Sequence, residues 1–213
     1  MDGPDQRRLR SCSTPGSERQ SILPMRLART ALVVFAALVL GLGSAVAAIE
    51  VVASRGTVRV GAWTTSTTLG SGASGLYERA ATAAHALFVL NRSQTIYYRA
   101  RVDDAGARLR ADCDYEIRGR PPAARWWSLT AYGVDDYLLA NEPGRHSFSG
   151  RTIALEPDGG YVVRASARPQ PGNWLPLGGH GGVYFTLRLY NPPPELAARP
   201  TTAPLPTITR RCP

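Results

Sequence analysis

The clearest pattern in the chain is an alternation of apolar and polar residues over residues 126–132. Trp127, Leu129 and Ala131 fall on one side of an extended chain, because successive side chains of a strand point to opposite faces. The other side carries Trp126, Ser128, Thr130 and Tyr132. This pattern predicts a strand with a core face and an aromatic, polar face, as found in a sandwich or barrel.

The same two-residue period recurs through most of the chain after residue 57. It predicts strands over residues 58–63, 95–102, 113–117, 137–139, 146–148, 152–155, 161–167 and 183–190. We expect a loop over 64–75, a turn at 169–172 that leads into residues 173–176, and an extended, Pro-rich tail up to Pro213. Short strands separated by Asp, Asn, Gly and Pro turns, without strand–helix alternation, predict an all-β fold: an antiparallel sandwich or jelly roll.

Two segments have a different pattern. Residues 76–90 repeat Leu and Ala at spacings of three and four, which predicts one short helix with an Ala-rich apolar stripe. Residues 30–49 carry no charge, and apolar residues continue to Val52, so 30–52 is predicted to be a transmembrane helix. Residues 1–29 have no periodicity and are predicted to be a disordered cytoplasmic segment, in which Met25 is an alternative start.

The sequence predicts one orientation for the membrane helix, and it allows the helix either to be retained as an anchor or to be cleaved as a signal peptide. Arg26 and Arg29 precede it, which places its N-terminal side in the cytoplasm and residues 53–213 on the periplasmic or extracellular side of the inner membrane. The tripeptide 45–47, Ala-Val-Ala, also matches a signal-peptidase site. We favour a retained single-pass anchor because apolar residues continue beyond that site; a buried core helix is the least favoured alternative, because the run offers no polar face.

The basic residues of the chain are unusual in type. All 25 are arginine, there is no lysine, and the formal net charge is +9. They are dispersed, and no nucleic-acid-binding motif accompanies them, so no nucleic-acid partner is predicted. We attribute the absence of lysine to coding bias. We interpret the dispersed arginines as solvated surface residues, with attraction to an anionic envelope surface as the alternative.

Three cysteines allow at most one intramolecular disulfide. Cys12 precedes the membrane segment, whereas Cys113 and Cys212 follow it. If the domain is exported, the latter two share an oxidising compartment, and a bridge between them would tie the C-terminal tail to the sheet. Two free buried thiols are the alternative.

The chain offers little recognisable catalytic chemistry. Its three histidines lack metal-binding spacing, and neither a Gly-x-Ser-x-Gly elbow nor a glycine-rich phosphate loop is present. The acidic pairs at 103–104 and 135–136 are turn-forming in most proteins, although they could also serve as acid–base groups or calcium ligands. We therefore expect no metal and no cofactor, and we do not favour an enzyme; a hydrolase with carboxylates brought together by the fold is an alternative.

Four longer segments carry a family resemblance. They are NRSQTIYYRARVDDAGARL at 91–109, ARWWSLTAYGVDDYLLANEPGRHSF at 124–148, DGGYVVRASARPQPGNWLP at 158–176 and VYFTLRLYNPPPEL at 183–196. Over residues 60–210 the chain resembles the bacterial family called domain of unknown function 1214, in a short form that follows an export segment and lacks the companion domain of unknown function 1254. The resemblance implies a jelly-roll-like envelope domain and no particular activity.

Together these observations predict a membrane-anchored binding module for a cell-envelope carbohydrate or a partner protein. Flat aromatic rings, Arg and amide groups are the side chains with which proteins bind sugars. The candidate binding residues are Trp126, Ser128, Tyr132, Asn173, Arg188 and Tyr190. A structural component of an envelope assembly and a hydrolase acting on envelope glycans are the alternatives.

Overall fold

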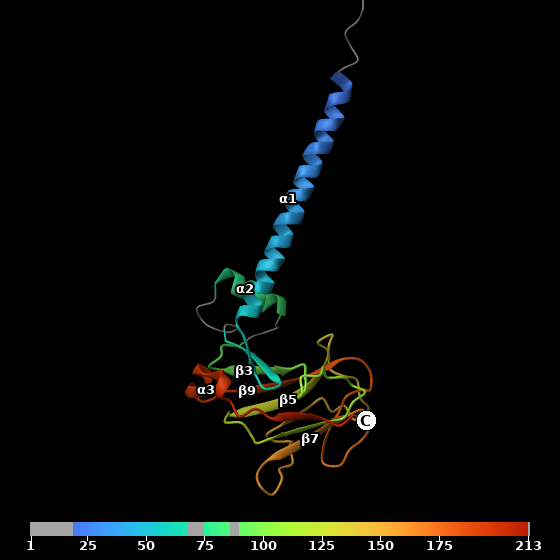
Figure 1. Ribbon diagram of the computed structural model, residues 1–213. Coiled ribbons are helices and arrows are strands. Elements are labelled where there is room, and N and C mark those ends of the chain that lie inside the picture. Colours follow the sequence, from blue (N-terminus) through green and yellow to red (C-terminus); the bar gives the residue numbers. More distant parts are fainter. Residues whose placement is uncertain (1–18, 68–74, 86–89, 213) are drawn as a thin grey trace, which may run out of the picture. The chain divides into compact units, whose positions relative to one another are not determined.

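The computed structural model describes residues 19–67, 75–85 and 90–212 (Figure 1). The chain divides into two compact units, Met1–Ala48 and Ile49–Pro213. Helix α1 (Arg19–Arg55) contains a stretch, Met25–Val52, that is long and apolar enough to cross a membrane. A signal sequence has the same properties, so α1 is compatible with either an anchor or a signal.

Helix α1 begins earlier than the sequence pattern indicates. It includes residues 19–29, which belong to the segment expected to be disordered, whereas residues 1–18 lie outside the described residues. Arg, Gln, Leu and Met are good helix formers. Once the apolar span is helical, extending it toward the N-terminus costs little, because each added residue gains a backbone hydrogen bond.

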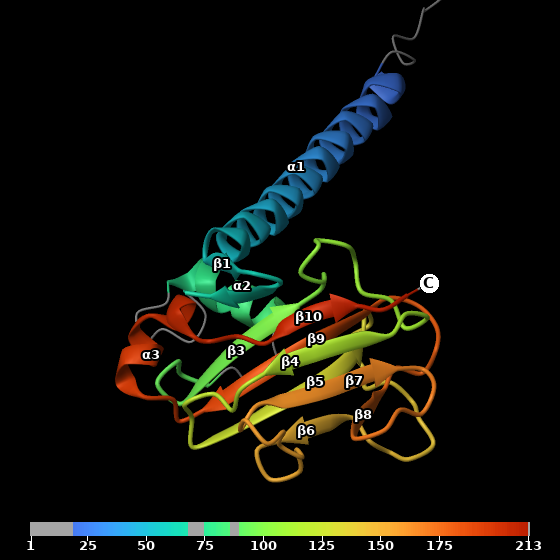
Figure 2. The same ribbon diagram turned by 60° about the horizontal axis from the view of Figure 1, so that its bottom comes forward.

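The second unit is built on two stacked sheets, as Figure 2 shows. The six-stranded sheet has the order β1 (Thr57–Val60), β2 (Trp63–Ser66), β3 (Thr95–Ala100), β9 (Val183–Tyr190), β5 (Trp126–Gly133) and β6 (Ser147–Ser149). The four-stranded sheet has the order β10 (Thr207–Arg210), β4 (Tyr115–Gly119), β7 (Tyr161–Ser166) and β8 (Asn173–Pro176). All neighbours are antiparallel except β7 and β8, which are parallel. The predicted all-β sandwich is confirmed.

Aromatic residues from both sheets meet in the core between them. The ring of Trp127 on β5 stacks on that of Tyr161 on β7, with centroids 5.2 Å apart. Phe185 on β9 meets the edge of Tyr115 on β4 at 6.1 Å. The six residues predicted to face the core on β5 and β9 are at most 3% exposed: Trp127, Leu129, Ala131, Phe185, Leu187 and Leu189. Their alternation predicted the buried face correctly.

The C-terminal tail is part of the sandwich and is not simply extended. It forms helix α3 (Pro194–Ala198), the 3-10 turn η1 (Pro200–Thr202) and the edge strand β10. Prolines lack an N–H group but keep a carbonyl acceptor. The buried Trp63 indole N–H donates to the Pro206 carbonyl at 2.7 Å, and the Tyr98 hydroxyl donates to the Pro200 carbonyl at 2.6 Å. The Pro-rich tail therefore satisfies two buried donors.

Three further contacts hold the tail to the sheets. The predicted disulfide between Cys113 and Cys212 is present. Asp103, which is 1% exposed, pairs through its carboxylate with Arg210 Nε at 2.9 Å. Asp104 accepts a hydrogen bond from the Ile208 backbone N–H at 2.7 Å. This acidic pair thus fastens β10 in addition to shaping a turn.

Several local predictions differ from the structure. Residues 64–66, expected in a loop, belong to β2, and residues 173–176 form β8. Residues 137–139 and 152–155 form no strand. The predicted helix at 76–90 is present as α2 (Leu76–His85), and residues 86–89 lie outside the described residues. The differences fall where a strand is only three or four residues long, too short for its period to stand out.

Candidate functional site

The outer face of the six-stranded sheet brings five of the six candidate binding residues together. In the register of β5 and β9, Trp126 lies opposite Tyr190 and Ser128 lies opposite Arg188. Side chains directly opposite one another in antiparallel strands share a face. The outer face includes Tyr97, Arg99, Trp126, Ser128, Thr130, Tyr132, Tyr184, Thr186, Arg188 and Tyr190, with Arg101 just beyond the end of β3.

One end of the outer face presents an aromatic pair. The rings of Trp126 and Tyr190 meet edge to face, with centroids 5.0 Å apart. Trp126 is 38% exposed, whereas its neighbour Trp127 is 3% exposed. An exposed indole held in place by a second ring is a ready surface on which an apolar ring face can stack.

The middle of the outer face has a floor of short hydroxyl side chains covered by one arginine. Ser128, Thr130 and Thr186 are 3–5% exposed. Arg188 donates to the Thr130 hydroxyl at 3.3 Å and to the Tyr132 hydroxyl at 2.8 Å. A guanidinium has five N–H donors. In the described part of the chain Arg188 uses only two of them, which leaves donors for a ligand.

The other end carries stacked tyrosines and two more arginines. The rings of Tyr132 and Tyr184 stack with centroids 5.4 Å apart at 17°. The guanidinium carbons of Arg99 and Arg101 lie 5.3 and 4.8 Å from the Tyr184 ring centroid. Both contacts are within the range of a cation–π interaction. This end is therefore positively charged.

A carboxylate also contacts this end of the face. Asp136, in the turn after β5, has a φ of 66° and accepts a hydrogen bond from the Tyr184 hydroxyl at 2.5 Å. Asp tolerates this left-handed conformation better than most residues. Burial, and then the bond to Asp136, raise the pKa of Tyr184 to about 12. Tyr184 accordingly remains neutral and keeps donating to Asp136 at neutral pH.

Asn173, the sixth candidate, lies on β8 in the other sheet. Its side-chain amide donates to the carbonyls of Ala154 at 2.8 Å and Val162 at 3.0 Å, and its oxygen accepts from the Ala154 N–H at 2.8 Å. The residue is 6% exposed. These bonds connect β8 to the strand and loop beside it.

We expect Asn173→Asp to lower the free energy of unfolding by about 2–3 kcal/mol, because two buried carbonyls lose their donor and face a carboxylate. Urea denaturation of the full chain in detergent measures the change. Gln94→Glu is the matched control, since Gln94 is an exposed amide whose side chain makes no hydrogen bond within the described residues. A loss no larger than that of the control would contradict the structural role of Asn173.

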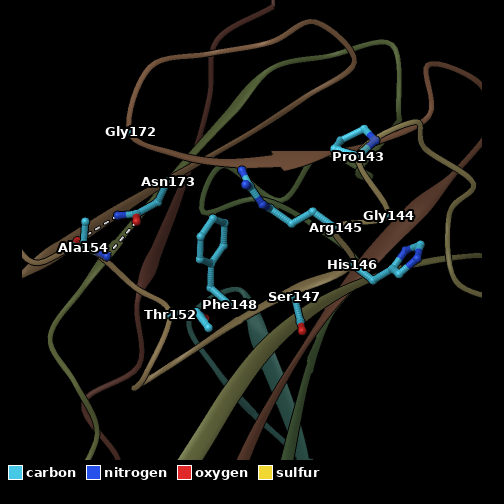
Figure 3. A pocket seen from close by; sticks show the side chains of 10 residues that line it. All are labelled: Pro143, Gly144, Arg145, His146, Ser147, Phe148, Thr152, Ala154, Gly172 and Asn173. Atoms are coloured by element: carbon cyan, nitrogen blue, oxygen red, sulfur yellow. Dashed lines mark hydrogen bonds between the residues drawn. The ribbon is translucent and has the colours of Figure 1, made fainter.

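Asn173 also borders an open pocket of about 680 Å³ between β6 and β8. Figure 3 shows its lining: Pro143, Gly144, Arg145, His146, Ser147, Phe148, Thr152, Ala154, Gly172 and Asn173. The guanidinium of Arg145 lies over the Phe148 ring and donates to the Trp174 carbonyl. Arg145 uses one of its donors there, so the pocket also has donors for a ligand. It differs from the outer face in that its phenyl ring, Phe148, is only 5% exposed.

The described residues contain no cluster of three His, Cys, Asp or Glu that could hold a metal ion. The sequence pattern missed four contributors to the outer face: Tyr97, Arg99, Arg101 and Tyr184. All four occupy the polar positions of alternating strands, so the signal was present. What the pattern could not show is that β3, β9 and β5 are neighbours in the sheet.

Comparisons with known proteins agree with the fold. Residues 94–194 match the family model described as Protein of unknown function (DUF1214). The crystal structure of the VPA0106 protein from Vibrio parahaemolyticus has 25% sequence identity and a TM-score of 0.55, covering 62% of this chain and 34% of the Vibrio protein. This chain thus matches about a third of that protein's length.

A crystal structure of an uncharacterized protein from Burkholderia cenocepacia has 20% identity and a TM-score of 0.38, covering 55% of this chain and 29% of that protein. No curated protein matches the chain.

Proposed function

We propose a function for this chain, which belongs through residues 94–194 to the family described as Protein of unknown function (DUF1214). It is a single-pass, inner-membrane-anchored protein whose β-sandwich faces the periplasm or the cell exterior and binds a carbohydrate of the cell envelope. The binding site is the outer face of the six-stranded sheet.

The observation that carries this proposal is the composition of the outer face. The exposed Trp126 with the half-buried Tyr190, and a half-buried arginine with unused donors, lie on one continuous strand pair over a floor of serine and threonine. Aromatic rings stack on the CH face of a sugar, while guanidinium and hydroxyl groups hydrogen-bond its oxygens. A face built only to pack against protein would not need these exposed donors.

The position of the domain in the chain supports an envelope ligand. Its polypeptide follows the apolar stretch Met25–Val52 directly. Arg26 and Arg29 lie at the N-terminal end of that stretch. Such an anchor with positive charge on its N-terminal side directs the following domain out of the cytoplasm. A disulfide between Cys113 and Cys212 suits an oxidising compartment.

Binding to an array of envelope glycans tests the proposal, with the full chain held in detergent. We expect Trp126→Ala to weaken binding roughly tenfold or more through loss of stacking, and Arg188→Ala to weaken it by a similar factor through loss of hydrogen bonds. Tyr137→Ala is the control, because this 75% exposed aromatic lies on the loop after β5 and on no strand of the face. Failure of the wild-type protein to bind any glycan would refute the proposed function.

A further inference from the structure

We propose that the carbohydrate bound by the outer face is an acidic glycan, whose anionic groups bind between Arg99 and Arg101 at the Tyr184 end of the face. This inference rests on the proposed function and specifies its ligand class. The anionic group is a carboxylate or a phosphate, since the guanidinium fork matches both.

Two arginines without an ion-pair partner among the described residues lie at one end of the face. Arg99 and Arg101 both place their guanidinium carbons within 5.3 Å of the centroid of one ring, that of Tyr184. Neither forms an ion pair with any carboxylate in the part of the chain that the structure describes. Two guanidinium groups on the same ring repel each other, and an anion bound between them attracts both.

The arginines of the other parts of the domain are arranged differently. Carboxylate-paired arginines include Arg110 with Asp112, Arg118 with Glu116, Arg120 with Asp158, and Arg210 with Asp103. Others are exposed to water, and two half-buried ones, Arg92 and Arg164, donate to the carbonyls of Thr67 and Pro171. Arg99 is half-buried but has neither a carboxylate nor a hydrogen-bond acceptor among the described residues. A partly desolvated guanidinium needs such partners, which favours a ligand as the partner of Arg99.

The nearest carboxylate does not neutralise this cluster. Asp136 accepts a hydrogen bond from the Tyr184 hydroxyl at 2.5 Å, and it forms no ion pair with Arg99 or Arg101. Tyr184 in turn stacks on Tyr132, whose hydroxyl accepts from Arg188. The three arginines are thus joined by rings and hydroxyls in a fixed arrangement, which reduces the entropy lost when they bind an anion.

The aromatic end and the arginine end of the outer face are separated along the direction of β5. Trp126 and Tyr132 are the ends of its polar row on β5, and six residues of strand span roughly 20 Å. A sugar ring stacked on Trp126 and an anionic group held at Arg99 and Arg101 therefore belong to an oligosaccharide of several units. A small anion alone would leave the aromatic end of the face unused.

Matched ligands test this inference in the full chain by titration calorimetry. The probes are an oligogalacturonate, its fully methyl-esterified form and a phosphomannan. We expect at least about tenfold tighter binding of the free acid or of the phosphomannan than of the ester. Whichever of the two charged glycans binds identifies the anionic group. The double variant Arg99→Gln/Arg101→Gln should lose this preference and keep the weaker binding of the ester.

Arg168→Gln is the control. Arg168 is exposed on the loop after β7, so this substitution removes a positive charge that lies away from the face. It should leave the preference unchanged. Equal binding of acid and ester would overturn this inference and leave the proposed function standing, whereas no binding of any glycan would refute the proposed function itself. Polyglutamate is the test for attraction to any polyanion. The inference would be overturned if polyglutamate bound as tightly as the charged glycans and if Arg168→Gln weakened that binding as much as the double variant does.

Discussion

Replacing both Cys113 and Cys212 by serine is expected to lower the free energy of unfolding by about 4 kcal/mol, because this disulfide joins residues 99 positions apart. A bridge across so long a loop greatly restricts the unfolded chain, and its removal restores that conformational entropy. Urea denaturation followed by tryptophan fluorescence, on the full chain in detergent under non-oxidising conditions, measures the loss.

The third cysteine supplies the control for this experiment. Cys12→Ser removes a thiol that precedes the membrane segment and should leave the unfolding midpoint unchanged. Adding reductant to the wild-type protein should reproduce the double variant. If the double variant unfolded at the same urea concentration as the oxidised wild type, the bridge would contribute nothing to stability and the tail would be held by its other contacts alone.

Those other contacts explain why the tail was the hardest part of the fold to predict. Strand β10 has one apolar residue, Ile208, between Thr207 and Thr209. Its stability comes from pairing with β4, from the Asp103–Arg210 ion pair and from the carbonyls that Pro200 and Pro206 offer to buried donors. These partners are distant in sequence, so no local pattern contains them.

The long strands were predictable for the opposite reason. Strands β5 and β9 each run for eight residues with one face in the core, so their alternation is strong enough to give both their location and their buried side. Strand β8 has four residues and pairs in parallel with β7. Its Asn173 repeats no pattern, and its role comes from hydrogen bonds to Ala154 and Val162.

The candidate site shows the same division between local and long-range information. Alternation placed Trp126, Ser128 and Tyr132 on one face of β5, and Arg188 with Tyr190 on one face of β9. That these two faces coincide, and that Arg99 joins them from β3, depends on strand order. Strand order is a long-range property, since β9 inserts between β3 and β5 although it is far from both in sequence.

Adjacent tryptophans on β5 provide the second large effect. We expect Trp127→Ala to lower the free energy of unfolding by about 3–5 kcal/mol, because the indole is 3% exposed and stacks on Tyr161 across the core. Removing a large buried side chain loses its transfer free energy and leaves a cavity. Urea denaturation of the full chain in detergent measures this loss.

Trp126→Ala is the matched control, since it makes the same substitution one residue away on the opposite face. Trp126 is 38% exposed and touches Tyr190 at the edge of its ring, so its removal should cost less than about 1 kcal/mol of stability. The two variants should then separate two roles: Trp127→Ala destabilises the fold, and Trp126→Ala weakens glycan binding in a protein as stable as the wild type. Equal losses of stability would mean that Trp126 is held in the packed structure as firmly as Trp127. The outer face would then lack the exposed aromatic surface on which its proposed binding of a sugar depends.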